Sequence, residues 1–570
     1  MKRARASWTI LPIIVALALA ASACRGGGAP RPKDTGPPPA TRNDINRVDR
    51  DALPDGGTLR WALVQIPPNF NLNHTDGPLG DNAAVMGALL LSPFDFDAAA
   101  QPVLRQELVE SAELTSTDPN QVVIYRINPK AIWYDGTPIT EADFEAQWRA
   151  LNGRDPRFKV ASTQGYDKIE SVAKGRDERE VVVTFKEKYA DWQGLFGLYP
   201  ASTNRNPKVF NEGWKEKPIT TAGPFKLEGI NLTDKTITLV RNEKWWGRPP
   251  KLERIIYRAI DADAHIDALA NGEIDFIDVG PNVDNFRRAQ KTRGVVLRKA
   301  GGPQFRHFTI NSTSEVLKDV RVRRALALGI DRARIAKALI GPLGVPAVPL
   351  NNHIYMTNQK GYQDNAGDLS RYDPKKAGEM LDEAGWKLAG GFRAKGGKRL
   401  TIRFVIPSQV AQARQESELA QAMLKKIGVE VNIETVPSGD FFDKNINPGN
   451  FDFTTFTWGG TVFPISSSKS IYAKPKAGPG GELDIQQNYA RVGSDELDRI
   501  FDKATAEFGQ DRAIELGNQI DAMIWEEVHS LTLYQRPEIV ATNAKLANFG
   551  AFGFATLIYE DVGFAAPSAP

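Results

Sequence analysis

The sequence predicts a mixed α/β (α+β) fold of at least two lobes. Strand-like and helix-like segments alternate along most of the chain, which is typical of this fold class. The region after the N-terminal segments has about 500 residues, more than the ~250–300 residues that usually share one core. Cysteine is absent after Cys24, so no disulfide stabilises this region and its stability must come from an apolar core.

The first 23 residues have the pattern of a secretory signal peptide. Three basic residues lie within positions 1–5, an apolar run of 11 residues covers 10–20, and small residues occupy 21–23. Cys24 follows directly and resembles the cysteine of a bacterial lipobox, whose thiol is acylated. The apolar run is too short to span a hydrocarbon core of about 30 Å. We therefore expect a lipid anchor at Cys24 on the extracytoplasmic face of the cell membrane, with an ordinary secreted protein as the alternative.

A flexible tether is expected at 24–55. Residues 25–40 contain five prolines and four glycines, a composition that does not build a core. Residues 42–55 are polar and charged, and we assign them to the same tether. Folded sequence is expected from about residue 56, where apolar and polar residues begin to alternate.

Local patterns predict the elements of the folded region in order. Alternating residues predict strands at 56–64, 121–127, 181–185, 236–240, 429–433 and 451–458. Helical periodicity predicts helices at 264–271, 322–339 and 419–427, the last ended by Gly428. Two glycine pairs between 386–388 and 400–404 predict a hairpin that joins these two segments. Residues 475–482 are rich in glycine and proline and are expected to form a surface loop.

Charge and motifs exclude several classes of function. The chain has 72 basic and 69 acidic side chains, and the predicted signal peptide contains three basic residues and no acidic one. The mature protein then has 69 of each, which argues against nucleic acid as a partner. The five histidines are scattered, and neither an HExxH nor a GxSxG motif occurs. We expect no metal, no cofactor and no catalytic residues.

Aromatic residues provide a candidate binding surface. The predicted strand 451–458 ends with Trp458, which is followed by Gly459 and Gly460. A flat aromatic ring beside two glycines lets the backbone of a ligand approach closely. The alternative is that Trp458 only packs in the core.

Six motifs together resemble one family. They occur in that family's order and are WYDGTPITEAD (133–143), TAGPF (221–225), NEKWWG (242–247), LANGEID (269–275), DVRVRRAL (319–326) with IDR (330–332), and YDP (372–374) with AGW (384–386). Together they resemble the extracellular solute-binding proteins of family 5, the receptors of oligopeptide, dipeptide and nickel ABC importers. Several of the motif residues have scaffold roles, because Asp135 with Gly136 suits a tight turn, and Thr140 with Asp143 suits a helix N-cap.

The resemblance implies two lobes that close on a ligand about a two-strand hinge, as in periplasmic binding proteins. The first lobe is expected at 56–305 and 537–570, with an extra subdomain at about 91–215. The second lobe is expected at 306–536. The chain would cross between the lobes near 305–311 and 531–534.

The resemblance also implies where a ligand binds. In relatives the loop that matches 67–76 faces the cleft, which makes Phe70, Asn71, Asn73 and His74 candidates for ligand binding. The alternative is that the asparagines only form turns. Asn311 and Tyr534 are candidates at the crossings. The remaining candidates, in the second lobe, are Trp458, Gly459, Gly460 and Thr461.

One position departs from the family pattern. Peptide-binding relatives usually carry an aspartate shortly after the tryptophan that matches Trp458, and this aspartate pairs with the α-amine of the peptide. Here Thr461 occupies that place. Either another carboxylate, for example Asp440 or Asp452, replaces it, or the ligand is a sugar, a modified peptide or a lipid-linked glycan. Nickel is disfavoured because the sequence has no histidine cluster.

These observations predict a monomeric, lipid-anchored receptor of an ABC importer. It would capture a peptide-like or other polar solute between its lobes and deliver it to a membrane permease. The alternative is the same fold used as a cell-envelope regulator or sensor that binds a glycan or glycolipid, like a mycobacterial lipoprotein of this family linked to mannoside synthesis. An exported enzyme is the third hypothesis, and no residue of the sequence supports it.

Overall fold

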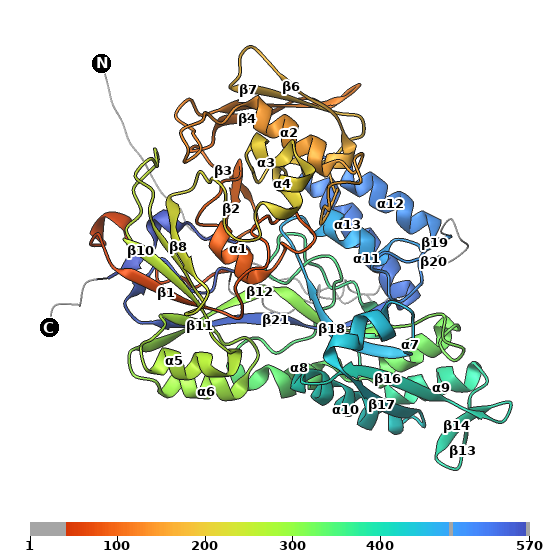
Figure 1. The fold of residues 1–570 in the computed structure, drawn as a ribbon. Coiled ribbons are helices and arrows are strands. Elements are labelled where there is room, and N and C mark those ends of the chain that lie inside the picture. Colours follow the sequence, from red (N-terminus) through yellow and green to blue (C-terminus); the bar gives the residue numbers. More distant parts are fainter. Residues whose placement is uncertain (1–41, 478–482, 566–570) are drawn as a thin grey trace, which may run out of the picture. The chain divides into compact units, whose positions relative to one another are not determined.

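The computed structural model describes residues 42–477 and 483–565 (Figure 1). The predicted signal peptide, the lipidation site Cys24 and the first part of the predicted tether lie outside the described residues. Of the predicted loop at 475–482, the structure describes only the beginning. There β19 (Lys476–Ala477) pairs with β20 (Leu483–Asp484).

A ten-stranded mixed sheet forms the centre of the fold. From one edge to the other its strands are β17 (Glu430–Val436), β16 (Thr401–Pro407), β18 (Phe453–Gly459), β12 (Val295–Ile310), β21 (Ser530–Asn543), β11 (Phe276–Asp278), β1 (Thr58–Leu63), β10 (Arg254–Ala259), β9 (Thr236–Arg241) and β8 (Phe225–Asn231). The β1–β10 and β16–β17 pairs are parallel, whereas β12 pairs antiparallel with both of its neighbours. The predicted mixed α/β class is confirmed.

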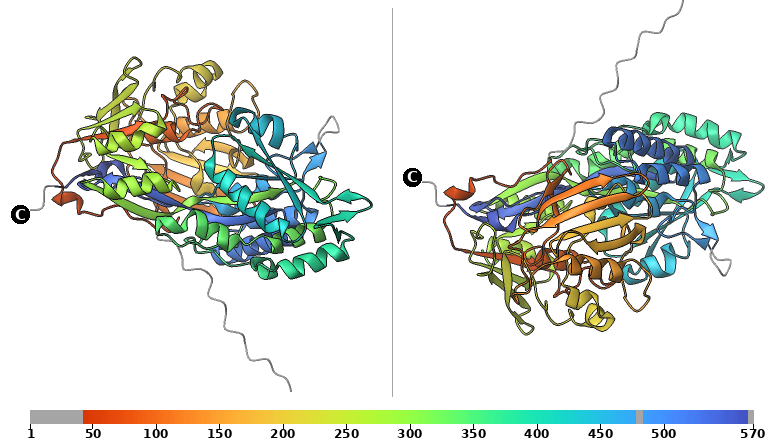
Figure 2. Two further views of the ribbon diagram at one scale, coloured as in Figure 1. Left: turned by 90° about the horizontal axis from the view of Figure 1, so that it is seen from below. Right: turned by 90° about the horizontal axis from the view of Figure 1, so that it is seen from above.

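Two long strands join the halves of this sheet. β12 and β21 run side by side through its middle, which both views of Figure 2 also show. Their register shifts between Gly301 and Phe305, and again between Arg306 and His307. Such irregularities bend a strand locally. They fall near the predicted crossing at 305–311, while the predicted lobe boundaries themselves stay predictions.

Helices cover the part of the large sheet that runs from β11 to β17. They are α5 (His265–Ala270), α6 (Val283–Lys291), α7 (Val320–Gly329), α8 (Arg332–Leu339), α9 (Pro374–Glu383) and α10 (Ala411–Lys425). Figure 1 shows α5, α6, α8 and α10 along one side of the sheet. Side chains such as Phe286 and Leu424 join Phe308 and Phe404 of the strands in one buried apolar cluster.

The single helix predicted at 322–339 is wrong. The structure has two helices, because Asp331 caps the second one by accepting a hydrogen bond from the Arg334 backbone N–H. An aspartate that caps a helix adopts non-helical backbone angles, so it ends the preceding helix as well. The apolar period continues across the break, which is why the pattern alone predicted one element.

The predicted hairpin between 386–388 and 400–404 also needs correction. β13 (Lys387–Ala389) pairs with an intervening strand, β14 (Phe392–Lys395), which in turn pairs with β15 (Lys398–Arg399). Each glycine pair therefore makes its own turn. The residues from Thr401 onward belong to β16 of the large sheet.

A second, four-stranded sheet lies in the first half of the chain. Its order is β4 (Val109–Ser116), β5 (Gln121–Ile127), β7 (Glu180–Phe185) and β6 (Ile169–Lys174). Helix α2 (Glu141–Leu151) packs on it through Phe144 and Trp148. The predicted N-cap is confirmed, because the buried Asp143 accepts hydrogen bonds from the backbone N–H groups of Thr140 and Ala201. Short elements complete this region: α1 (Gly80–Met86), β2 (Phe94–Phe96), β3 (Pro102–Leu104), α3 (Ala201–Asn204) and α4 (Pro207–Glu212).

Three helices precede β21. They are α11 (Pro464–Tyr472), α12 (Asp495–Thr505) and α13 (Gln510–Glu527), and they share a buried apolar cluster that contains Ile465, Phe501 and Ile520. The short strands β22 (Leu546–Ala547) and β23 (Gly563–Phe564) follow β21. Helix α11 begins five residues after Gly459, the last residue of β18. The chain therefore passes directly from the predicted binding strand to the helices α11, α12 and α13.

The stretch 44–53, which we expected to be part of a flexible tether, is bonded to the C-terminal region. Asp44 forms a β-bridge with Ala551. The Asn548 side chain donates to the Val48 carbonyl oxygen and accepts from the Val48 N–H. Leu53 is 3% exposed. The polar composition of this stretch reflects side-chain hydrogen bonds to the folded chain, so the folded part begins before residue 56.

Candidate ligand site

Trp458 lies at the end of β18, within a group of aromatic rings. Its ring is parallel to that of Tyr489 at 5.8 Å and nearly parallel to that of His307 at 6.0 Å, and Phe456 meets it edge-on at 5.1 Å. The ring is partly buried. Part of the ring therefore packs against other side chains, and part remains accessible to a ligand. The structure thus combines features of the predicted binding surface and of the alternative, core packing.

The segment after Trp458 stays bonded to β12 through Gly460 and then continues toward α11. The Gly460 backbone N–H donates to the Pro303 carbonyl oxygen at 2.6 Å. The Thr461 hydroxyl donates to Ser467 and accepts from the Phe463 N–H, and the Thr461 carbonyl oxygen accepts from Gln359. Thr461 and Gly459 are exposed. Hydrogen bonds thus hold the backbone of this segment in place, while Gly459 remains exposed to solvent.

The two glycines are expected to respond differently to alanine. A Cβ on Gly459 would meet no atom within 4 Å, whereas one on Gly460 would lie 2.7 Å from the Pro303 carbonyl oxygen. Gly460→Ala should therefore lower the free energy of unfolding by about 1–3 kcal/mol. Gly459→Ala should leave stability nearly unchanged and weaken ligand binding, because the methyl group would keep a ligand backbone away. Thermal unfolding and calorimetric titration of both variants check this, and equal stability losses would contradict it.

An aromatic cavity of about 290 Å³ lies next to this segment. Residues of the predicted subdomain, 99–102 and 190–193 with Leu114, form one side. The other side consists of residues of the predicted second lobe, which are Tyr355, 359–361, 462–465, Ala504, Glu507, Phe508, Gln510, Ala513 and Ile514. Its aromatic lining consists of Trp192, Tyr355, Phe463 and Phe508. A cavity near 300 Å³ that is mostly apolar with a few polar groups is typical of small-molecule sites.

Contacts between the two sides hold the aromatic cavity together. The Ala190 backbone N–H donates to the Thr505 carbonyl oxygen at 2.9 Å, and Gln510 donates to Gln101 at 3.1 Å. Phe463 meets Phe96 edge-on with ring centres 5.4 Å apart. Among the described residues, no ion pair joins the lining residues of the two sides.

Asp191 lies in the wall of the aromatic cavity, just before the short 3₁₀ helix Trp192–Gly194. Burial raises the pKa of its carboxyl group to about 6, and a hydrogen bond with Ser466 offsets that rise only in part. Within residues 42–477 and 483–565, no lysine, arginine or histidine forms an ion pair with Asp191. Burial likewise raises the pKa values of the neighbouring Tyr189 and Tyr355.

A polar cavity of about 680 Å³ lies on the other side of the strip 189–191. It is lined by 161–168, by Lys188 and Tyr189, and by residues of α11 and α12. Its carboxylate Asp502 pairs with Lys469. Asp167 of the same lining pairs with Lys168, so two of the carboxylates of this cavity are in ion pairs, unlike Asp191 of the aromatic cavity.

No residue of the predicted loop 67–76 lines either cavity, although the Asn73 carbonyl oxygen accepts a hydrogen bond from the backbone N–H of Ala161, which lines the polar cavity. Phe70 is buried in the core beside β1, and the Asn71 amide donates to the Phe210 carbonyl oxygen at 3.0 Å. His74 is buried, its Nδ1 accepts from the Asp76 N–H, and burial lowers its pKa. Asn73 is partly buried beside it. The Asn73 amide nitrogen and His74 Nε2 have no hydrogen-bond partner in the described part of the chain, and a ligand role for this loop stays a prediction.

Asn311 and Tyr534 are buried and bonded within the protein. The Asn311 amide donates to the carbonyl oxygens of Gly449 and Phe451, and its Oδ1 accepts from Thr313. The Tyr534 hydroxyl donates to Glu416 at 2.7 Å. These side chains are 2% and 0% exposed, respectively. None of the predicted site residues lines the aromatic cavity itself, but Trp458, Gly459, Gly460 and Thr461 directly precede its lining residues 462–465.

The two carboxylates considered as substitutes for the family aspartate already have partners. Asp440 pairs with Lys444 at 3.0 Å on the surface. Asp452 accepts from the Ser314 hydroxyl and from the Arg403 backbone N–H. Neither lines the aromatic cavity.

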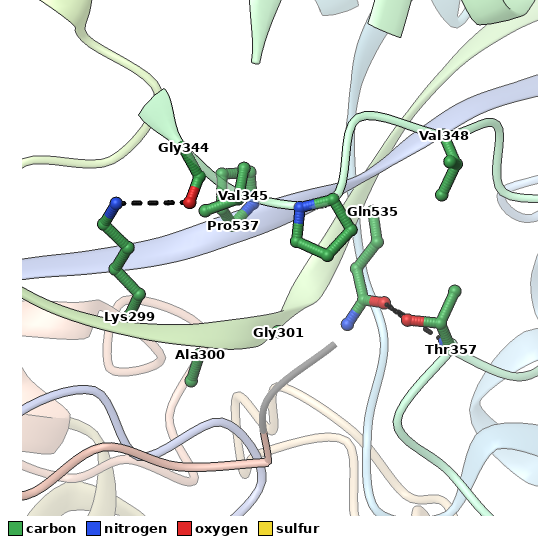
Figure 3. A pocket seen from close by; sticks show the side chains of 10 residues that line it. Lys299, Ala300, Gly301, Gly344, Val345, Val348, Thr357, Gln535 and Pro537 are labelled. Atoms are coloured by element: carbon green, nitrogen blue, oxygen red, sulfur yellow. Dashed lines mark hydrogen bonds between the residues drawn. The ribbon is translucent and has the colours of Figure 1, made fainter. Parts of the chain in front are cut away.

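A third cavity, of about 120 Å³, lies at the irregular pairing of β12 and β21 (Figure 3). Lys299, Gly301 and Pro537 line it together with 344–348. The Lys299 ammonium donates to the Leu343 carbonyl oxygen, and burial lowers its pKa. The cavity occurs where the strand register shifts, so packing is looser at this point of the sheet.

The described residues contain no cluster of three or more potential metal ligands. Over the same residues, none of the helices combines the length and the hydrophobicity that crossing a bilayer requires.

Comparisons with known proteins identify the family. A family model for bacterial extracellular solute-binding proteins, family 5 (Middle), matches residues 104–478. Oligopeptide-binding protein OppA of Mycobacterium tuberculosis is 40% identical over 565 residues, which cover 97% of this chain and 93% of OppA. The chain belongs to family 5 of the bacterial extracellular solute-binding proteins. Membership of this family of binding proteins also confirms the prediction that the protein is not an enzyme.

Other family 5 proteins agree over most of the chain. Oligopeptide-binding protein AppA of Bacillus subtilis is 25% identical over 524 residues, 88% of each chain. Among solved structures, the periplasmic EDTA-binding protein EppA matches with a TM-score of 0.83 and 27% identity, covering 94% of this chain and all of EppA. The structure of B. subtilis AppA in complex with a nonapeptide matches with a TM-score of 0.72 and 21% identity over 90% of this chain and all of that chain. The periplasmic-binding-protein-like fold is thereby confirmed.

Sequence reasoning missed part of the candidate site of this family 5 protein. Asp191, Tyr355, Ser466 and Phe508 belong to four separate segments, and no local motif marks them. The one local signal is that Asp191 and Trp192 are neighbours in the sequence. Such acidic–aromatic pairs are common on protein surfaces, so this signal does not indicate a binding site.

Proposed function

We propose that this protein is a lipid-anchored receptor that captures peptides between two lobes and delivers them to the permease of an ABC importer. The observation that carries the proposal is the aromatic cavity, because segments of both predicted lobes line it. Burying a ligand between two bodies stabilises their closed arrangement, and closure gives a permease a surface to recognise.

Oligopeptides are the ligand class with the most support. OppA of M. tuberculosis, named for oligopeptide binding, is similar along almost the whole chain. The exposed Gly459 at the end of β18 suits the approach of an extended peptide backbone, since its neighbouring space is open. The aromatic walls suit apolar side chains.

Mass spectrometry of what the protein retains tests the proposal. The folded body, residues 42–570, would be purified without denaturant and its bound small molecules released by acid. We expect a mixture of short peptides. Recovery of a single glycolipid instead would contradict the peptide assignment and favour the envelope-regulator hypothesis. A probable monoacyl phosphatidylinositol tetramannoside-binding protein, LpqW of M. tuberculosis, is 27% identical over 55% of this chain.

The membrane anchor has a separate test. Cys24→Ser in the full-length chain removes the thiol that a lipid would modify, so the protein should move from the membrane fraction to the medium. Metabolic labelling with a palmitate analogue should mark the wild type and not the variant. Label on Cys24→Ser would contradict the proposed lipidation.

A further inference from the structure

The aromatic cavity contains more negative than positive charge. Its charged lining residues are Asp191, Glu507 and Lys360. The Lys360 ammonium pairs with the exposed Asp511 and donates to the Gln510 side-chain oxygen, each at 3.0 Å. Neither Asp191 nor Glu507 forms an ion pair within the described ranges, whereas most other charges near the two cavities are paired.

Asp191 is the more deeply placed of these carboxylates. Its polar contact in the predicted second lobe is Ser466 in the first turn of α11, which is a neutral partner and lines the polar cavity. The Glu507 carboxylate accepts from the Gly509 N–H and lies at the edge of α12. A largely buried carboxylate without a cation is unfavourable, and a ligand cation would relieve this.

We propose that Asp191 binds an ammonium group of the ligand within the aromatic cavity. This inference rests on the proposed function and names the part of the peptide that enters the cavity, which is its amino end. Trp192, Tyr355, Phe463 and Phe508 would surround the first side chain, and aromatic rings near an ammonium group add a cation–π attraction. The ligand amine would thus be held from the predicted subdomain and not from the segment after Trp458.

The test compares two forms of one peptide library. Random tri- and tetrapeptides without lysine or arginine would be offered with free amino ends or with acetylated ones. We expect the wild type to bind the free-amine library about 100-fold more tightly, because acetylation removes the cation and leaves the carboxylate unpaired. Asp191→Asn should bring the two affinities within about threefold. Asp502→Asn is the matched control and should keep the wild-type preference, since Asp502 already pairs with Lys469.

Each other result overturns the proposal in a distinguishable way. A wild type that binds both libraries equally would refute the amine site and leave peptide binding intact. An Asp191→Asn variant that keeps the preference would place the amine elsewhere. Equal weakening of both libraries would mean that Asp191 only stabilises the contact with Ser466. Binding of neither library would refute the proposed function as well.

The wild type offers a second test that needs no variant at Asp191. Below the raised pKa of about 6 the carboxyl is protonated before binding, so the amine must displace a proton. Affinity for the free-amine library should fall by up to tenfold for each pH unit below 6 and level off above it. Tyr189 and Tyr355 stay neutral in this range because burial raises their pKa values. The acetylated library should show no such slope, and a slope shared by both libraries would contradict the proposal. Glu507→Gln should retain the slope, which excludes the other unpaired carboxylate.

Discussion

Replacing Glu416 by glutamine is expected to lower the free energy of unfolding by about 3–5 kcal/mol. Glu416 is 0% exposed and accepts hydrogen bonds from Arg306, Thr455 and Tyr534. The Arg306 side chain is 3% exposed, so the change would leave a buried guanidinium without its carboxylate. This network joins α10 to β12, β18 and β21, which are the central strands of the large sheet.

A second substitution on the same helix provides the control. Glu418 of α10 pairs with Arg414 at 3.0 Å, and both side chains are exposed. Glu418→Gln should change stability by less than about 0.5 kcal/mol, because water screens such pairs. Guanidinium unfolding followed by circular dichroism measures both variants. A loss below 1 kcal/mol for Glu416→Gln would show that the buried network tolerates an uncompensated charge.

Truncating Trp458 to alanine is expected to weaken peptide binding at least tenfold and to lower the free energy of unfolding by about 2–3 kcal/mol. The loss of binding follows from removing the flat wall beside Gly459. The loss of stability follows from removing the parallel ring contacts with Tyr489 and His307. Titration calorimetry and thermal unfolding measure the two effects separately.

Trp246 gives a matched control for Trp458. It is also partly buried, and its indole N–H donates to the Glu107 carbonyl oxygen at 2.7 Å, away from the lining of both cavities. Trp246→Ala should cost a similar amount of stability and leave affinity unchanged. Equal losses of affinity in the two variants would show that Trp458 acts only through folding.

Short-range patterns predicted much of the fold. β5 matches its predicted range 121–127, and β7, β9 and β17 lie within a few residues of theirs. Apolar and polar residues alternate along a strand because only one of its faces is buried. This pattern lies within a few consecutive residues, so the sequence reveals it directly. The predicted long helix failed because apolar spacing continued through Asp331, where only the capping geometry shows a break.

The candidate site was less predictable than the fold. Trp458 and Gly459 are neighbours in the chain, so their combination was visible. Asp191 is buried and lacks an ion-pair partner because segments distant in the sequence exclude water from it and supply no cation. The local sequence 188–194 does not reveal either condition. The polar stretch 44–53 misled for a related reason, since hydrogen-bonding side chains look the same whether their partners are water or protein.

The attachment of residues 44–53 to the C-terminal region affects how a soluble form of the protein should be made. A recombinant protein cut at Gly56 would lose the strand bridge of Asp44, the two bonds between Val48 and Asn548, and the buried Leu53 side chain. It would uncover the apolar surface on which Leu53 packs and leave the Asn548 side chain with only its hydrogen bond to the Asp561 carbonyl oxygen, and exposed apolar surface favours aggregation. A recombinant protein that begins at or before Arg42 keeps residues 44–53 and should be the more soluble one.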